Sequence, residues 1–411
     1  MNIYLILVLA IYGIFYLLDV VIELLNIKNI KETVPNEFDG VYEPKKYQES
    51  QRYLKETTRF SLIKSTIGLI VFVPFMLLGG FNYLDVVARG FGFGSIITGL
   101  IYIGILGFLS SLMSMPFSVY GTFVIEKKYG FNKTTVKTFV TDTIKMILLS
   151  VAIGAPILAL VLWFFESFTN FAWLYVWGAL TVIQVVLMVV APIWIMPLFN
   201  KFIPLEEGDL RKSIEDYATK EGFSLQGIFK MDGSKRSTKS NAYFTGLGKY
   251  KRIVLFDTLI EKHSVNELVG IVAHEMGHFK HKHIYKLMAM GILTSGLMLY
   301  TLSLFLNNPG LFQAFQMEQL SIYASLIFFS FLFKPIELFL GIFSNVLSRK
   351  YEFEADEYAV RTTSSQDDMV SALKTLSVDN LSNLNPHPMK VFIEYSHPPV
   401  LTRIKAIKAI Q

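Results

Sequence analysis

The sequence predicts an all-α polytopic membrane protein that carries a small α+β lobe outside the membrane. Of its 411 residues, 52% are hydrophobic and only 17% are charged. The mean hydropathy of +0.45 is well above that of soluble globular proteins. Three uncharged stretches, 90–125, 167–200 and 287–317, each exceed the roughly 20 residues that span a ~30 Å hydrocarbon core. These observations argue against a soluble enzyme.

Seven apolar segments are the expected membrane helices. The first lacks the positive n-region and the cleavage site of a signal peptide, so we expect it to be retained as an anchor. The seven segments are 3–25, 62–83, 96–115, 144–165, 171–198, 287–306 and 322–343.

Basic residues set the expected orientation. Four segments, 27–59, 116–143, 199–285 and 347–411, hold 33 of the 38 Lys and Arg residues. By the positive-inside rule they face the cytoplasm and the N-terminus lies outside, as an odd number of spans requires. The net charge of +5 is too small to indicate a nucleic-acid partner, and the absence of Cys excludes thiolate metal ligands.

The expected organisation has four parts. Residues 1–198 form helices one to five with their loops, and 286–346 form helices six and seven. The cytoplasmic loop 199–285 is predicted to contain a helix at 208–222 and strands at 225–231, 242–247 and 252–256. We expect it to dock with the cytoplasmic segment 347–411 as one lobe.

A metal-binding pattern lies just before the sixth span. Ser264 followed by Glu267 is a capping box, which predicts the start of a helix. On that helix His274 and His278 are four residues apart, so both imidazoles can reach one Zn²⁺, with Glu275 beside the first ligand. This composition gives HExxH by chance only about 0.01 times, which favours a zinc site over two surface histidines.

A catalytic zinc needs a third protein ligand and an open fourth position. After the seventh span, the helix-compatible segment 348–360 places Glu352 and Asp356 on one face and Glu354 on another. Glu352 is the expected third ligand, and Asp356 is placed to accept the free ring N–H of a ligating His. The alternative is an exposed acidic helix face.

Two charged residues lie inside the seventh predicted span. Lys334 is midway along it, and Glu337 follows one turn later. Charges are costly in lipid, so we expect this pair to face protein or a water-filled cavity. A self-neutralised pair packed between helices and a functional pair both remain open.

These features resemble the type I CAAX prenyl proteases, which are integral-membrane zinc endopeptidases that process farnesylated a-factor and prelamin. The resemblance covers essentially the whole chain and rests on seven spans, HExxH at the cytoplasmic start of a membrane helix, and Glu-x-x-x-Asp beyond the next span. Further matches are Asn241-Ala242-Tyr243-Phe244, His283, and Ser396-His397-Pro398 followed by Arg403.

The resemblance implies one zinc per chain, bound by His274, His278 and Glu352, with Glu275 as general base and acid. It also implies that the helices enclose a large aqueous chamber onto which the zinc site opens.

The resemblance further suggests that the strand of Asn241, Ala242 and Tyr243 pairs with substrate, and that His397 and Arg403 stabilise the tetrahedral intermediate. We assign His281 and His283 to structural or supporting roles outside the ligand set, because a tetrahedral site with three protein ligands has no room for them.

The sequence therefore predicts a membrane zinc metalloendopeptidase that hydrolyses peptide bonds near the C-terminus of prenylated CAAX-type or other membrane-associated polypeptides. Its expected partners are a peptide or protein substrate, farnesylated or not, and the lipid bilayer. One alternative is a quality-control zinc protease without a prenyl requirement, against which the seven spans argue. Another is a seven-helix receptor or transporter, in which HExxH would have no purpose.

The expected location is a multi-pass position in a bacterial inner membrane. The chain ends without a dilysine or KDEL-type retrieval signal and contains no Cys. In a eukaryotic host the corresponding membrane would be that of the endoplasmic reticulum.

Overall fold

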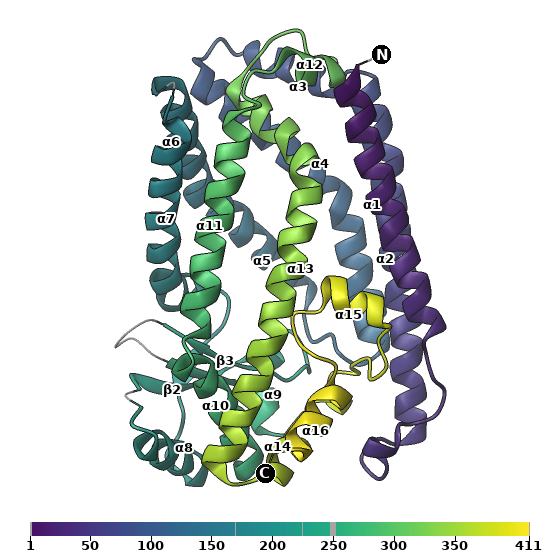
Figure 1. Ribbon diagram of the computed structural model, residues 1–411, viewed down its shortest axis with the longest axis vertical. Coiled ribbons are helices and arrows are strands. Elements are labelled where there is room, and N and C mark those ends of the chain that lie inside the picture. The colour runs from purple at the N-terminus through teal and green to yellow at the C-terminus, as the bar shows by residue number, and fades with distance from the viewer. Residues whose placement is uncertain (1, 169, 224, 247–251, 411) are drawn as a thin grey trace.

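The computed structural model describes residues 2–410 except 169, 224 and 247–251. Within these residues, seven helices are long and apolar enough to cross a membrane, which confirms the predicted membrane part. They run along the long axis of the molecule, with the N-terminus at one end and the C-terminus at the other (Figure 1). The spans are α1 (Ile3–Lys28), α2 (Pro44–Leu77), α4 (Ser95–Tyr120), α5 (Val136–Leu149) with α6 (Ala155–Ser167), α7 (Ala172–Val190), α11 (His283–Ser303) and α13 (Ile322–Thr363).

The second span differs from its predicted bounds of 62–83. Helix α2 begins at Pro44, well before the apolar run, and ends at Leu77. Gly79 then adopts a φ of +76°, a left-handed conformation that favours glycine, and the chain turns into the separate helix α3 (Gly80–Arg89). Only the apolar half of α2 was predicted, because its first half is polar and hydropathy does not mark it as part of a span.

The seventh span continues far beyond its predicted end at residue 343. Helix α13 is 42 residues long and runs unbroken into the lobe. Its extension is tied to helix α15 (Pro388–Glu394), because Arg349 donates hydrogen bonds to the carbonyls of Val391 and Tyr395. The acidic segment that was expected to follow the span is therefore part of the same rigid helix.

A four-stranded mixed sheet forms beside the membrane helices. The strands are β1 (Phe202–Pro204), β2 (Gly227–Met231), β3 (Ala242–Thr245) and β4 (Arg252–Phe256), in the order β1-β2-β4-β3. Strands β2 and β4 are parallel, whereas β1–β2 and β3–β4 are antiparallel. The three predicted strands are present, although 247 lies outside the described residues. Strand β1 was missed, because three residues are too few for an alternating pattern.

The lobe has one hydrophobic core. Buried Leu255 of β4, Val272 of α10, Val360 of α13 and Ile404 of α16 belong to a single cluster, so segments from both sides of the last two spans share it. The remaining helices are α8 (Asp209–Lys220), α9 (Asp257–Ile260), α10 (Val265–Lys280), α14 (Gln366–Asp379) and α16 (Val400–Lys408) in the lobe, with α12 (Pro309–Ala314) at the opposite end.

At that opposite end, a buried polar network ties α3 to α13. Asp85 is 1% exposed. It accepts a hydrogen bond of 2.5 Å from the Tyr323 hydroxyl and pairs with Arg89 at 2.7 Å. The Asp85 carboxylate thus joins Tyr323 and Arg89 next to a cluster of apolar side chains.

We expect Asp85→Ala to lower the free energy of unfolding by about 2–4 kcal/mol, because it leaves the buried Tyr323 hydroxyl and the partly exposed Arg89 guanidinium without their acceptor. The matched control is Glu215→Ala, which breaks the exposed Arg211–Glu215 pair of the same i,i+4 spacing. It should cost less than about 1 kcal/mol. Unfolding midpoints in detergent compare the two variants, and equal shifts would contradict this account of the end opposite the lobe.

Candidate active site

Helix α10 carries the HExxH residues and starts as predicted. The Ser264 hydroxyl accepts from the backbone N–H of Glu267, and the Glu267 carboxylate accepts from the backbone N–H of Ser264 at 2.8 Å. This reciprocal cap fixes the first turn and therefore the helical phase of His274, Glu275 and His278.

Helices α10 and α13 cross at a glycine. A Cβ atom added to Gly277 would lie 3.1 Å from the Ala355 Cα atom and 3.2 Å from the Cβ atom of Tyr358. The absence of a side chain at Gly277 thus allows the two backbones to approach closely. As a result Glu352, almost one turn before Ala355 on α13, reaches the two histidines of α10.

The three expected ligands converge. His274 Nε2 and His278 Nε2 are 3.1 Å apart, and carboxylate oxygens of Glu352 lie 3.4 and 3.3 Å from them. Tetrahedral zinc with ligands at about 2.0–2.1 Å requires ligand atoms about 3.3–3.4 Å apart. Glu352 Oε2 is buried and accepts no hydrogen bond from the described residues, although Arg403 Nη1 lies 3.3 Å from it. The group fits a metal ion without rearrangement.

A carboxylate orients the first histidine. Asp356 Oδ1 lies 2.8 Å from His274 Nδ1, and Arg403 in turn donates to both oxygens of Asp356 at 2.6 and 2.8 Å. Burial works to lower the pKa of His274, but hydrogen bonds to Asp356 and Glu352 outweigh it and raise the pKa to about 9. The Nδ1–H bond to Asp356 leaves Nε2 directed at the metal position.

The second histidine is supported by a chain of two further groups. His283 Nδ1 lies 3.1 Å from His278 Nδ1, and His283 Nε2 lies 2.9 Å from Glu354 Oε2. His283 is 1% exposed, and its ring stacks on Tyr351 with centroids 4.1 Å apart. Glu354 was assigned no role by the sequence analysis, because its helical phase turns it away from Glu352. Its partner on α11 is visible only in the fold.

His281 lies outside the three-donor group. It is exposed and stacks on His283, with ring centroids 5.5 Å apart. Together with Glu354 the two histidines could form a second group of metal-ligating atoms.

Two other predicted catalytic residues, Glu275 and His397, are accessible to solvent. Glu275 follows His274 and is half-buried; within the part of the chain that the structure describes, its carboxylate forms no hydrogen bond or ion pair. His397 Nε2 is 3.3 Å from Glu352 Oε1, and its side chain is 65% exposed. Both side chains can therefore meet a molecule that approaches from solvent.

The predicted substrate strand is an edge strand. Among the described residues, strand β3 pairs only with β4, and it also contacts α10. The backbone N–H of Phe256 donates to the Asn241 carbonyl, which makes this a hydrogen-bonded pair. Because such pairs alternate in antiparallel ladders, the backbone groups of Ala242 and Phe244 point to the free edge. The Asn241 amide oxygen accepts from the Ala242 N–H at 2.9 Å.

Not every predicted feature is brought together. Lys334 lies over the rings of Tyr12 and Phe15 of α1, at 4.8 and 5.1 Å from their centroids. Glu337 is exposed, and the described residues include no ion pair between it and Lys334. The interpretation of the two as a self-neutralised pair is therefore wrong.

The HExxH helix and the downstream glutamate together form a three-donor metal site. In a chain with seven membrane helices, such a site is typical of a membrane metallopeptidase. Comparisons with known proteins agree. Residues 23–201 match the model of the CAAX prenyl protease N-terminal region with five membrane helices, and residues 204–411 match that of peptidase family M48.

Similar proteins match along almost the whole chain. CAAX prenyl protease 1 of Saccharomyces cerevisiae is 35% identical over 92% of this chain and 90% of its own length. The Homo sapiens homolog is 32% identical over 92% and 89%. The crystal structure of S. mikatae Ste24p superposes with a TM-score of 0.94 at 32% identity and covers 99% of both chains. The chain belongs to the CAAX prenyl protease 1 family of M48 membrane metallopeptidases.

The glycine crossing gives a test of the site. We expect Gly277→Ala to weaken metal binding by about 10-fold, because the new methyl group pushes α13 and Glu352 away from α10. This is the lower end of the loss in affinity seen when a residue that supports a metal ligand is changed. Titration of the metal-free protein with zinc measures this.

Gly270→Ala is the matched control on the same helix. A Cβ atom at Gly270 would lie 3.8 Å from the Met369 Sδ atom, an ordinary contact. Its metal affinity should equal that of the wild type. An unchanged affinity in Gly277→Ala would show that the close crossing does not position Glu352.

Proposed function

We propose that this chain is a zinc endopeptidase that hydrolyses peptide bonds near the C-terminus of prenylated CAAX-type or other membrane-associated polypeptides. The observation that carries the proposal is the group of His274, His278 and Glu352, whose donor atoms lie 3.1–3.4 Å apart at tetrahedral spacing beside Glu275. The substrate class is supported by the relatives named CAAX prenyl protease 1.

The proposed ligands are His274 and His278 through Nε2 and Glu352 through its carboxylate, with one zinc per chain. Two imidazoles and a carboxylate are a donor set of hydrolytic zinc sites. When bound, zinc supplies Lewis-acid chemistry that polarises a peptide carbonyl and acidifies water.

Glu275 is the proposed proton carrier. Its carboxylate has no competing partner among the described residues, so it can take a proton from the attacking water and later deliver it to the leaving amine. His397, exposed and next to Glu352, is placed to donate a hydrogen bond to the oxyanion. Loss of one such donor costs about 3–4 kcal/mol of transition-state stabilisation.

Arg403 is proposed to act through Asp356. The resemblance assigns it to the tetrahedral intermediate, but its Nε and Nη2 atoms are engaged by Asp356, and its side chain is 12% exposed. A guanidinium held in this way fixes Asp356, and thereby the ring of His274, more directly than it could contact substrate.

The free edge of β3 is the proposed substrate site. An extended peptide can add to an exposed sheet edge through backbone hydrogen bonds. In this binding mode, sequence specificity comes only from pockets that accept side chains of the peptide. The outward carbonyl of Ala242 and the outward backbone groups of Phe244 support this role, together with the neighbouring Asn241 and Tyr243. Close to α10, such a strand would bring a scissile bond toward the metal.

We propose that the lobe faces the cytoplasm and that the spans surround an aqueous interior. The basic segments support the orientation. Only 0–17% of the apolar window of each span is buried, which a single layer of helices with two open faces explains better than a solid bundle. The proposed membrane is the bacterial inner membrane, or that of the endoplasmic reticulum in a eukaryotic host.

Cleavage of a farnesylated CAAX peptide by the purified protein tests the activity. Wild type should lose activity with a chelator and regain it with Zn²⁺. Glu275→Gln should keep about one zinc per chain while its kcat falls by at least about 100-fold, the effect of losing general acid–base catalysis.

The unprenylated peptide of the same sequence separates the substrate classes. Slower cleavage of this peptide supports a prenyl requirement, and equal cleavage would move the function to membrane-associated chains in general. Absence of bound zinc from the wild type would overturn the peptidase proposal.

His283 is proposed to support His278. We expect His283→Ala to weaken zinc binding by about 10–100-fold, because the Nδ1–H of His278 loses its acceptor. His281→Ala should leave zinc affinity unchanged. Equal losses in both variants, measured by competition with a chromogenic chelator, would argue against a specific role for His283.

A further inference from the structure

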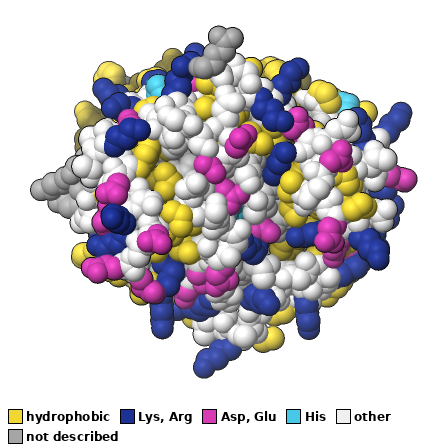
Figure 2. Space-filling model, turned by 90° about the horizontal axis from the view of Figure 1, so that it is seen from below, with side chains coloured by type: hydrophobic (Ala, Val, Ile, Leu, Met, Phe, Trp, Pro, Cys, Tyr) yellow, Lys and Arg dark blue, Asp and Glu magenta, His cyan; other side chains and the backbone are white. Residues whose placement is uncertain are grey.

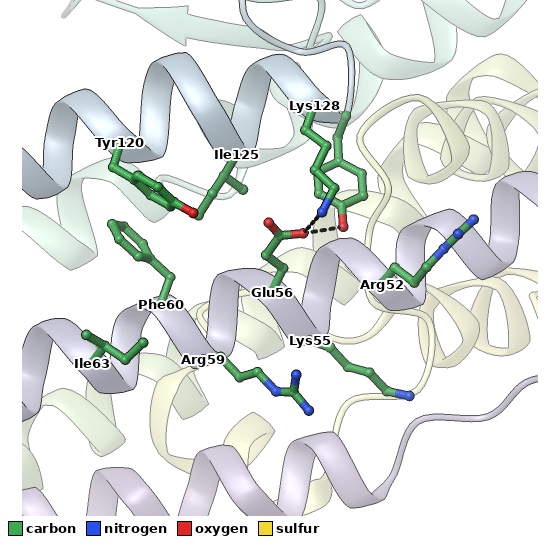
Figure 3. Close-up of a pocket in the computed structure, with 10 residues that line it drawn as sticks. Arg52, Lys55, Glu56, Arg59, Phe60, Ile63, Tyr120, Ile125 and Lys128 are labelled. Atoms are coloured by element: carbon green, nitrogen blue, oxygen red, sulfur yellow. Dashed lines mark hydrogen bonds and ion pairs between the residues drawn. The ribbon is translucent and has the colours of Figure 1, made fainter.

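A pocket outside the metal site lies between α2 and the end of α4. It has a volume of about 400 Å³. The close-up shows Glu56 and Phe60 directed toward the helix that carries Tyr120, while Lys55 and Arg59 leave α2 in a different direction; all four side chains line the pocket (Figure 3). The π-helical turn 121–126, which follows α4, contributes Ile125 to the lining.

Three cations of this pocket are engaged in no hydrogen bond or ion pair with the described residues. Arg52, Lys55 and Arg59 repeat at helical spacing along one face of α2, and among the described residues none of them forms a hydrogen bond or an ion pair. The single carboxylate, Glu56, is already engaged by Lys128 at 2.6 Å and by a tyrosine hydroxyl at 2.7 Å. Four cations and one carboxylate leave the pocket with a formal charge of +3.

An apolar stripe continues the cationic face into the membrane span. Ile63, Ile67 and Ile70 are 54%, 38% and 63% exposed. The opposite face of α2 carries the polar or small residues Ser61, Lys64 and Gly68, so the isoleucine stripe is the face suited to lipid. The cations lie at the polar end of this stripe, before the uncharged part of α2, which begins after Lys64.

The dimensions match one membrane leaflet. At 1.5 Å per residue, the cations from Arg52 to Arg59 cover about 10 Å, and the stripe from Arg59 to Ile70 covers about 16 Å. Half of a ~30 Å hydrocarbon core is about 15 Å, and the headgroup layer adds about 5–8 Å. Seen from the lobe end, Lys and Arg side chains lie mostly around the rim of the molecule, where headgroups would surround it (Figure 2).

We propose that this pocket binds one anionic phospholipid of the leaflet on the lobe side. Its phosphate is held by Arg52, Lys55 and Arg59, and an acyl chain lies along the isoleucine stripe. Unpaired cations on one helix face repel one another, and a headgroup phosphate relieves this repulsion. A free phosphate shares the anionic chemistry but has no group to cover the stripe, which favours the lipid.

Native mass spectrometry of the full-length protein in detergent tests the site, with dioleoylphosphatidylglycerol as the probe. We expect wild type to retain one molecule per chain. The variant Arg52→Gln/Lys55→Gln/Arg59→Gln should bind it about 100-fold more weakly, or about 5-fold for each lost cation. Arg59→Gln alone, with a loss of about 5-fold, tests the same site should the triple variant not fold.

The matched control removes the same charge from the same segment. In Lys31→Gln/Lys45→Gln/Lys46→Gln the affinity should equal that of the wild type, and unfolding midpoints establish that each variant is folded. An equal loss in this control would overturn the proposal in favour of a general surface potential.

Two further arms distinguish the ligand sources. Ile63→Asn/Ile67→Asn should weaken lipid binding without a change in charge, and dioleoylphosphatidylcholine should bind more weakly than the anionic lipid. Millimolar inorganic phosphate should fail to displace the lipid. Displacement by phosphate, or equal binding of the zwitterionic lipid, would overturn the assignment.

Discussion

The close crossing of α10 and α13 is the constraint on which the metal site depends. The HExxH motif on one helix supplies two donors from adjacent turns. The third donor must come from a second helix whose backbone approaches the first closely. Gly277 removes the side chain that would separate the helices, and the nearest atoms are main-chain atoms of Ala355, which cannot rotate away. The position of Glu352 is thus set by backbone packing and not by a flexible loop.

Around that crossing, each histidine is held from its far side by a different pair of groups. Asp356 with Arg403 holds His274, and His283 with Glu354 holds His278. The members of the two pairs lie on α13, α11 and α16. Together with α10, which carries the two histidines, four helices fix the two ring orientations. Such outer contacts select the tautomer and make the ring a better ligand. They also explain why the site needs a lobe that joins distant parts of the chain.

The sequence predicts the parts of this site that depend on local periodicity. The capping box, the i,i+4 histidines, and the shared face of Glu352 and Asp356 all follow from 3.6 residues per turn. Seven spans follow from apolar length. Contacts between helices do not follow from any local pattern, and so the link from His283 to Glu354 required the fold.

The same limitation applies to element boundaries. Hydropathy marks where lipid contact ends, not where a helix ends, so α2 and α13 both extend well beyond their predicted spans. Strand β1 has only three residues, too few to show a period of two. The turn at Gly79 depends on its positive φ, which the average hydropathy of an apolar segment does not reveal. Elements fixed by tertiary contacts or by a single glycine are those that a sequence pattern misses.

The continuity of α13 also sets how deep the proposed active site lies. Glu352 is five residues beyond Leu347, the last apolar residue before the charged residues Arg349 and Lys350, which is about 8 Å along the helix axis. The headgroup layer is about 5–8 Å thick, so the metal ligand lies near the membrane surface. An extended peptide covers about 3.3 Å per residue, and a chain anchored in the bilayer crosses this distance in about two or three residues. A rigid helix that fixes the metal at this height therefore favours bonds close to a membrane anchor over bonds in a distant folded domain.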